Sequence, residues 1–201
     1  MFTGIVTGTG TIREVTTDAD GRRLRIETDA LGEFEHGESI AVNGVCLTVE
    51  EYGEDWFSVF TATETLEKST FDDAEPGTQV NLERPLSADG RFDGHVVQGH
   101  VDTTTTVEAI EQVGEDYTFT FAQPPGYGQY LASKGSVTID GVSLTVAEID
   151  DAAGTFDIAI IPTTYAETRF GEYAVGDRVN VEVDVIAKYV ERLAEAGDQS
   201  S

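Results

Sequence analysis

The chain has 201 residues, which allows one large domain or two domains of about 100 residues each. Its 12 basic and 38 acidic residues give a net charge of −26, so nucleic acid is not expected as a partner because its phosphates would be repelled. A single cysteine excludes an intramolecular disulfide and a cysteine-based zinc site, and three histidines give little support for any metal site.

The first half of the chain reads as short strands in which apolar and polar residues alternate. The expected strands cover residues 9–15, 23–28, 39–52, 56–63 and 79–84. A hairpin turn is expected at 53–55, and Asn43-Gly44 predicts a tight turn or bulge inside the third segment. Residues 30–34 and 65–71 could each add a short helical turn.

The second half repeats this pattern. Strands are expected at 104–110, 117–122, 135–149, 155–160 and 178–184, with turns at Asp140-Gly141 and at 151–154. Five or six short strands per half predict a small antiparallel barrel, because closing a sheet removes its exposed edges.

The C-terminus is the only clearly helical region. From Asp184 onward, one apolar stripe is formed by Ile186, Tyr189, Val190 and Leu193. Packing of this stripe against a partner subunit is favoured over docking on the chain's own barrel, and the alternative stays open. Residues 197–201 are expected to be disordered.

Sequence motifs recur at a spacing of about 97 residues. NGVCLTVEE (43–51) matches DGVSLTVAE (140–148), PGTQVNLE (76–83) matches VGDRVNVE (175–182), and FTGIV (2–6) matches VQGHV (97–101) more faintly. We therefore predict one domain duplicated once, with barrels at 1–93 and 94–184 and a helix with a tail at 185–201.

A few residues in these motifs could carry chemistry. Cys46 and Ser143 occupy matched positions, and the threonines two residues further on, Thr48 and Thr145, should face the same side of each strand. Taken alone, however, such a cysteine is usually a small buried apolar residue, and such a serine usually bonds the backbone.

Two histidines and one lysine are also notable. His95 and His100 lie five apart in the sequence and should face opposite sides of a strand, which disfavours a metal pair. Either histidine could simply bond the backbone, and Lys134 could be an ordinary surface lysine in a loop.

The acidic residues are spread along the whole chain and interleave with apolar ones. This distribution is typical of a protein surface adapted to high salt, where a Debye length of about 3 Å at 1 M screens self-repulsion. No stretch of about 18 apolar residues could form a membrane helix. The first ten residues lack the basic and apolar regions of a signal peptide, so a cytoplasmic location is expected.

An ordered set of motifs resembles the riboflavin synthase family of the two-barrel, lumazine-binding type. The set comprises MFTGIV, NGVCLTV, GHVVQGHVD, SKG followed by IDGVSLTV, and IPTT, and the resemblance extends from Met1 to about Leu193. It implies an all-β fold of two homologous six-stranded Greek-key barrels in tandem plus a C-terminal helix. It also implies a homotrimer held by that helix.

The resemblance further implies a reaction between two molecules of 6,7-dimethyl-8-ribityllumazine. One molecule gives a four-carbon unit to the other, and the products are riboflavin and a ribitylamino-pyrimidinedione. No cofactor or metal is implied. A non-catalytic lumazine or flavin carrier on the same fold is the main alternative, and a flavin-dependent oxidoreductase is disfavoured by the scarcity of basic residues near the candidate sites.

Site residues follow from the resemblance at matching positions. The first substrate-binding site would comprise Gly4, Ile5, Val6, Cys46, Leu47, Thr48, Phe60, Thr61, Ala62, Thr63, Glu64 and Thr65. The second would comprise Gly99, His100, Val101, Lys134, Ser143, Leu144, Thr145, Ile161, Pro162, Thr163, Thr164, Tyr165 and Ala166. His100 and Ser143 are the candidates for proton transfer or nucleophilic addition, with Cys46 as their counterpart in the other barrel.

Overall fold

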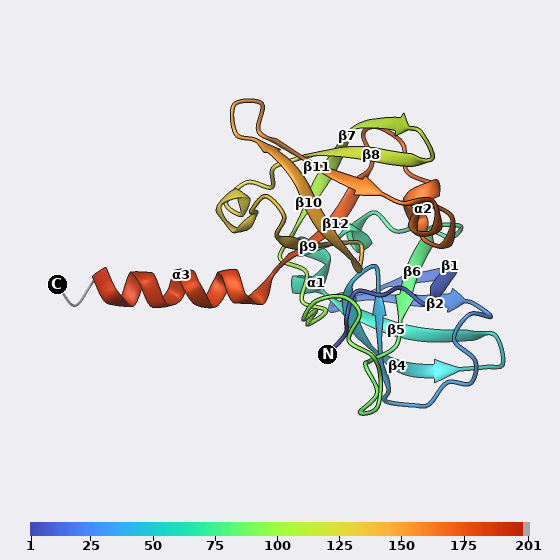
Figure 1. The fold of residues 1–201 in the computed structure, drawn as a ribbon. Helices are drawn as coiled ribbons and strands as arrows, with labels where there is room; N and C mark the ends of the chain where they lie inside the picture. The colour runs from blue at the N-terminus through green and yellow to red at the C-terminus, as the bar shows by residue number, and fades with distance from the viewer. Residues whose placement is uncertain (199–201) are drawn as a thin grey trace.

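Two β-barrels lie one above the other, and a single helix projects away from them (Figure 1). The structure is a computed structural model that describes residues 1–198. Each barrel is a closed antiparallel sheet of six strands. The predicted all-β fold with a C-terminal helix is therefore confirmed.

The first barrel is closed in the strand order β1-β2-β5-β4-β3-β6. Its strands are β1 (Gly8–Thr17), β2 (Gly21–Glu27), β3 (Ser39–Val42), β4 (Val45–Tyr52), β5 (Trp56–Ala62) and β6 (Gln79–Glu83). Helix α1 (Thr63–Lys68) and the short η1 (Thr70–Asp72) precede β6, which confirms helical structure within 65–71. Residues 30–34, for which the sequence allows a helical turn, contain bends and no helix.

The second barrel repeats this topology six strands later, in the order β10-β11-β8-β7-β12-β9. Its strands are β7 (Thr103–Val113), β8 (Asp116–Ala122), β9 (Ser136–Ile139), β10 (Val142–Asp150), β11 (Thr155–Ile160) and β12 (Arg178–Val183). The short helices are η2 (Gly128–Tyr130), α2 (Pro162–Glu167) and η3 (Arg169–Gly171).

Alternating side chains build a separate apolar core inside each barrel. In β4, for example, Val45, Leu47 and Val49 are buried in the core, whereas Cys46 and Thr48 between them are more exposed. In β10, Val142 and Val146 are buried and the half-buried Leu144 packs against the core, whereas Thr145 is exposed. The predicted pairing of these polar residues on one strand face is thus confirmed, and that face is the outer one.

The barrels meet through a pseudo-symmetric set of hydrogen bonds. The Asn81 side chain donates to the carbonyl of Asp140 at 2.9 Å, and the Asn180 side chain donates to the carbonyl of Asn43 at 2.9 Å. Asn43 and Asp140 both adopt positive φ in the tight turns that were predicted between paired strands. Matched residues of the duplicated domain therefore hold its two copies together.

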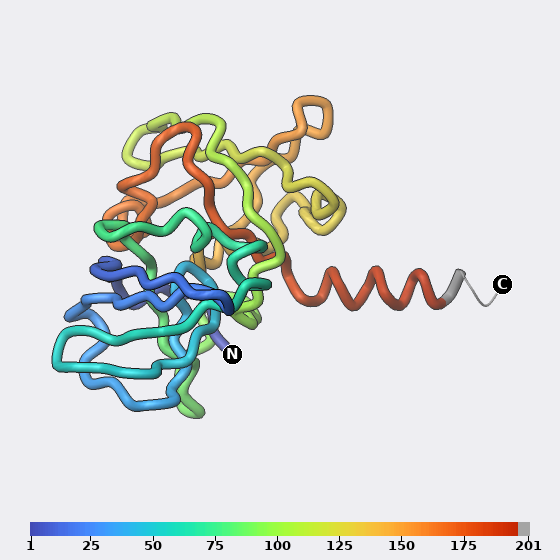
Figure 2. Tube along the Cα trace, turned by 180° about the vertical axis from the view of Figure 1, so that it is seen from behind, coloured from blue at the N-terminus to red at the C-terminus, as the bar shows by residue number. Residues whose placement is uncertain are grey.

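Helix α3 (Val185–Asp198) begins after Asp184, whose carboxylate accepts the N–H of Ile186 at 2.9 Å. It leaves the barrels and extends away from them in both views (Figure 2). Contacts between the helix and the second half of the chain include an ion pair of Lys188 with Asp102 at 2.7 Å. The Tyr130 hydroxyl also donates a hydrogen bond to the Glu191 carboxylate. The helix runs to Asp198, so residues 197 and 198 are helical rather than disordered as expected, and 199–201 lie outside the described residues.

The apolar stripe predicted on α3 is exposed in the single chain. Ile186, Tyr189, Val190 and Leu193 are between 60% and 72% exposed. Docking of the stripe on its own barrel, the alternative left open above, is therefore wrong. Among residues 1–198 no helix is long and apolar enough to span a membrane.

Candidate functional site

Two segments that precede the barrels cross over to the opposite barrel. The carbonyl of Gly4 accepts the N–H of Ser143 in the second barrel at 2.7 Å, and the carbonyl of Gly99 accepts the N–H of Cys46 in the first at 2.8 Å. Val6 packs against the core of the second barrel, and Val101 packs against that of the first. We call residues 2–6 and 97–101 the crossing segments; they pair with each other through Phe2 and Val97.

This crossing corrects the grouping of site residues made from the sequence. Gly4, Ile5 and Val6 were expected beside Cys46, and Gly99, His100 and Val101 beside Ser143. The structure exchanges the two sets. The family resemblance assigned each segment to the copy that it begins, but backbone hydrogen bonds attach each one to the other copy.

Glycine is required where each crossing segment touches its strand. Gly4 has φ +76° and Gly99 has φ +79°, a region that other residues rarely adopt. A Cβ at Gly4 would lie 2.6 Å from the Cβ of Ser143, and a Cβ at Gly99 would lie 2.6 Å from the Cβ of Cys46. The two glycines thus permit contacts that no larger residue allows.

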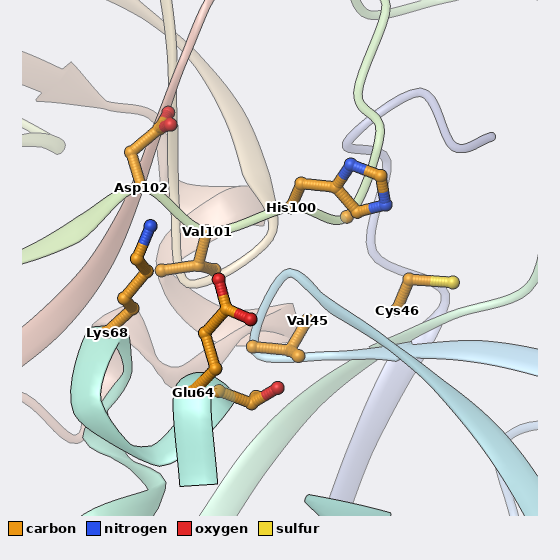
Figure 3. Close-up of a pocket in the computed structure, with 9 residues that line it drawn as sticks. Val45, Cys46, Glu64, Lys68, His100, Val101 and Asp102 are labelled. Carbon is orange, nitrogen blue, oxygen red and sulfur yellow. The ribbon is translucent and has the colours of Figure 1, made fainter. Parts of the chain in front are cut away.

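The first site is an open pocket of about 390 Å³ beside Cys46. In Figure 3, Glu64 and Lys68 rise from α1 toward Val101, and the His100 ring lies on the same side as Cys46. The pocket is lined by Val45, Cys46, Glu64, Thr65, Lys68, Gly99, His100, Val101 and Asp102. It combines apolar surface with a few polar groups, which is typical of small-molecule sites.

Lys68 and Asp102 were not among the residues predicted for this pocket. Asp102 accepts the N–H of Val183 at 3.0 Å and pairs with Lys188 of α3 at 2.7 Å. The pocket lining is therefore connected directly to the projecting helix.

The second site contains a short hydrogen-bonded chain that the sequence did not reveal. His95 Nδ1 lies 2.7 Å from the hydroxyl of Ser143, and its Nε2 lies 3.2 Å from the hydroxyl of Thr138. Burial lowers the pKa of His95, although the charge of Asp184 partly opposes this. A neutral ring near pH 7 has one accepting nitrogen and one donating nitrogen, so it can exchange a proton with a hydroxyl group.

His95 and His100 serve different sites, as predicted. His95 reaches Ser143 of the second barrel, whereas His100 lines the pocket next to Cys46 of the first. Within residues 1–198, no cluster of three or more histidine, cysteine, aspartate or glutamate side chains is arranged to hold a metal ion.

The remaining predicted residues fall into two groups. On the first barrel, Thr61 is buried and donates to the carbonyl of Arg22, and Phe60 lies under the Arg23 guanidinium. On the second, Tyr165 of α2 stacks on Tyr117 with ring centroids 3.8 Å apart. The Lys134 ammonium lies 3.4 Å from the carbonyl of Ala147, beyond Thr145 on the same strand.

Comparison with known proteins agrees with this geometry. The family model described as the lumazine binding domain matches twice, at residues 3–85 and 98–184. The solved structure of LumP complexed with 6,7-dimethyl-8-(1'-D-ribityl) lumazine is similar, with a TM-score of 0.82 and 28% identity over 91% of this chain and 99% of that one. The chain therefore belongs to the family of proteins built from the lumazine binding domain.

Curated relatives narrow this assignment within the family. Riboflavin synthase of Bacillus subtilis (strain 168) is 39% identical over 201 residues, covering 100% of this chain and 93% of the relative. Riboflavin synthase of Mycobacterium bovis is 43% identical, covering 96% and 98%, and that of Schizosaccharomyces pombe is 41% identical, covering 98% and 95%. The chain is thus a member of the riboflavin synthases, enzymes of the transferase class.

Proposed function

We propose that this enzyme joins two molecules of 6,7-dimethyl-8-ribityllumazine by transferring a four-carbon unit from one to the other. The products are riboflavin and 5-amino-6-ribitylamino-pyrimidinedione. The reaction only redistributes atoms between two identical molecules, so it needs no external oxidant or reductant. The observation that best supports this reaction is the presence of two matched sites. Each site is made from a strand of one barrel and the crossing segment of the other barrel.

The two sites differ in the groups that they offer to identical substrates. The first presents Cys46 and His100, with Glu64 and Lys68 nearby. The second presents Ser143 bonded to His95. We assign nucleophilic addition or proton transfer to Cys46, His100 and Ser143, because a donor and an acceptor of a carbon unit require different chemistry.

Positioning supplies a large part of the proposed catalysis. Holding two reactants in a reactive geometry gives effective molarities of about 10⁵–10⁸ M in well-oriented systems. We propose that the first barrel of one subunit faces the second barrel of a neighbour in a homotrimer, and that α3 holds the subunits together. Support comes from the apolar stripe of α3, which is exposed in the single chain.

The activity is tested by incubating the purified protein with the ribityllumazine, without added metal or cofactor. We expect one riboflavin to form for every two lumazines consumed. A carrier on the same fold, the alternative suggested by the likeness to LumP, would bind lumazine or riboflavin without turnover. Tight binding with no riboflavin formed over a wide range of salt would favour the carrier.

The acidic surface predicts that stability depends on salt. With a net charge of −26, lowering the salt from about 2 M to about 0.1 M lengthens the Debye length from a few Å to about 10 Å and restores repulsion among the carboxylates. We expect the melting temperature to fall, by roughly 4–8 °C if about 2 kcal/mol is lost. Calorimetric melts at several salt concentrations check this, with sucrose added as a nonionic control. Melting curves that coincide at all salt concentrations would contradict it.

A further inference from the structure

Two buried glutamates occupy matched positions in the last strand of each barrel. Glu83 ends β6 and is 4% exposed, and Glu182 lies in β12 and is 2% exposed. Buried carboxylates are costly unless hydrogen bonds compensate them. Neither belongs to the groups assigned above to chemistry, so their retention inside the protein requires another explanation.

Glu83 binds the backbone of the first crossing segment. One carboxylate oxygen accepts the N–H of Thr3 at 2.8 Å and the hydroxyl of Thr3 at 3.0 Å, and the other accepts the N–H of Gly4 at 3.0 Å. Gly4 is the residue whose carbonyl then accepts the N–H of Ser143. The carboxylate of the first barrel thus holds the segment that borders the second site.

Glu182 does the same for the second crossing segment. Its oxygens accept the N–H groups of Gln98 at 2.7 Å, Gly99 at 3.0 Å and His100 at 2.9 Å. Gly99 bonds Cys46, and His100 lines the first pocket. Here the carboxylate of the second barrel holds the segment that borders the first site.

We propose that Glu83 and Glu182 are positioning residues, each of which holds the crossing segment that completes the binding site of the opposite barrel. A carboxylate suits this role because it only accepts hydrogen bonds, and each one faces two or three converging N–H donors. The geometric part of the proposal is independent of the reaction; its effect on catalysis rests on the proposed function.

A glutamine at either position would have nearly the same shape but the wrong hydrogen bonding. Its NH₂ group would face a backbone N–H, so at least one bond to the crossing segment would be lost. Protonation has a similar effect, because the neutral carboxyl presents an O–H to the donors. Burial raises the pKa of both carboxyls, while the backbone N–H groups, and Lys188 in the case of Glu182, oppose the rise.

The single cysteine reports more directly on the second crossing segment than on the first. Cys46 donates its N–H to Gly99, and its side chain also packs against Phe2 and Val97. Loss of the Glu182 bonds, which hold Gly99 itself, should therefore open the first site and expose the thiol, whereas loss of the Glu83 bonds, which hold Thr3 and Gly4, should have a smaller effect. We expect Cys46 to react with a thiol reagent about tenfold faster in Glu182→Gln than in wild type. Loss of about one charge-assisted hydrogen bond would raise the population of the open first site by about this factor. Glu83→Gln is the matched comparison and should react more slowly than Glu182→Gln.

The experiment is run with the full-length protein well below its melting temperature, and circular dichroism verifies the fold. Rates at several pH values separate exposure of the thiol from a change in its pKa. Equal labelling rates in wild type and both variants, or a rate in Glu83→Gln that equals or exceeds that in Glu182→Gln, would overturn the proposal. If a glutamine variant does not fold, Glu182→Asp and Glu83→Asp keep the charge, shorten the reach and give the same contrast.

Turnover separates this proposal from the proposed function. If wild type forms riboflavin, both glutamine variants should raise KM for the lumazine, and the activity of wild type should fall at acid pH before the barrels unfold. Activity in wild type with unchanged labelling and KM in the variants refutes only the positioning role. Absence of activity in wild type refutes only the reaction, because the labelling contrast remains a valid test of the geometry.

Discussion

Replacing Tyr189 and Leu193 together with glutamate is expected to produce monomers that remain folded but form riboflavin at least about 100-fold more slowly. Both side chains belong to the exposed apolar stripe of α3, at 67% and 72% exposure. Negative charges there would oppose association while leaving the cores of both barrels untouched. Without a neighbouring subunit, two bound substrates would no longer be held in a reactive geometry, and most of the positioning effect would be lost.

The control for the double glutamate variant is a variant with the same change in charge on another face of the helix. Arg192→Glu also changes the charge by −2, and Arg192 lies outside the stripe, where it pairs with Glu195 at 3.5 Å. Light scattering gives the subunit number, and turnover is measured at equal subunit concentration. A double variant that stays associated, or a monomer with full activity, would show that α3 does not assemble the active enzyme.

Asp140→Asn is expected to destabilise the protein by about 3–5 kcal/mol, because it breaks a buried ion pair and leaves one charge without its partner. The Asp140 side chain is fully buried. Its carboxylate accepts the hydroxyl of Tyr173 at 2.6 Å and the N–H of Asn180 at 2.7 Å, and it pairs with Arg169 at 3.2 Å. Burial raises the pKa of Asp140, and Arg169 opposes this rise, so removing the carboxylate would leave the guanidinium unpaired.

Asparagine is the appropriate replacement because Asn43 occupies the matched turn of the first barrel with a similar positive φ. Backbone strain is therefore not introduced, and the change isolates the charge. The expected loss corresponds to a fall in melting temperature of roughly 6–20 °C. Urea unfolding measures it, and the double variant Asp140→Asn/Arg169→Gln should recover part of the loss. A single variant as stable as wild type would show that the pair contributes little.

The fold could be predicted from the sequence because its determinants are local and repeated. Alternating apolar and polar residues identified the strands, and the match of 43–51 with 140–148 identified the duplication. The turns at Asn43-Gly44 and Asp140-Gly141 followed from residues that tolerate positive φ. The helix stripe was also predicted correctly, since a period of 3.6 residues is a local property.

The candidate sites could be predicted only in part, because their assembly depends on contacts between distant segments. Cys46, Ser143 and the two threonines stood out as matched polar residues, but nothing local indicates that Gly4 reaches Ser143 across the molecule. His95 could not be assigned to the second site from the sequence, because it contacts Ser143 only in the folded chain. The sequence does contain a signal for the two buried carboxylates: VNLE and VNVE each end in an acidic residue of an otherwise apolar strand, at Glu83 and Glu182.

The exchange of segments between barrels constrains how the duplicated halves can diverge. A substitution in residues 2–6 alters the surroundings of Ser143, and one in residues 97–101 alters those of Cys46. Substitutions at Gly4 or Gly99 therefore act on the copy of the domain to which these residues do not belong. Cutting the polypeptide between the halves would leave each fragment without the backbone partner of its own Cys46 or Ser143, even though each would retain its own apolar interior.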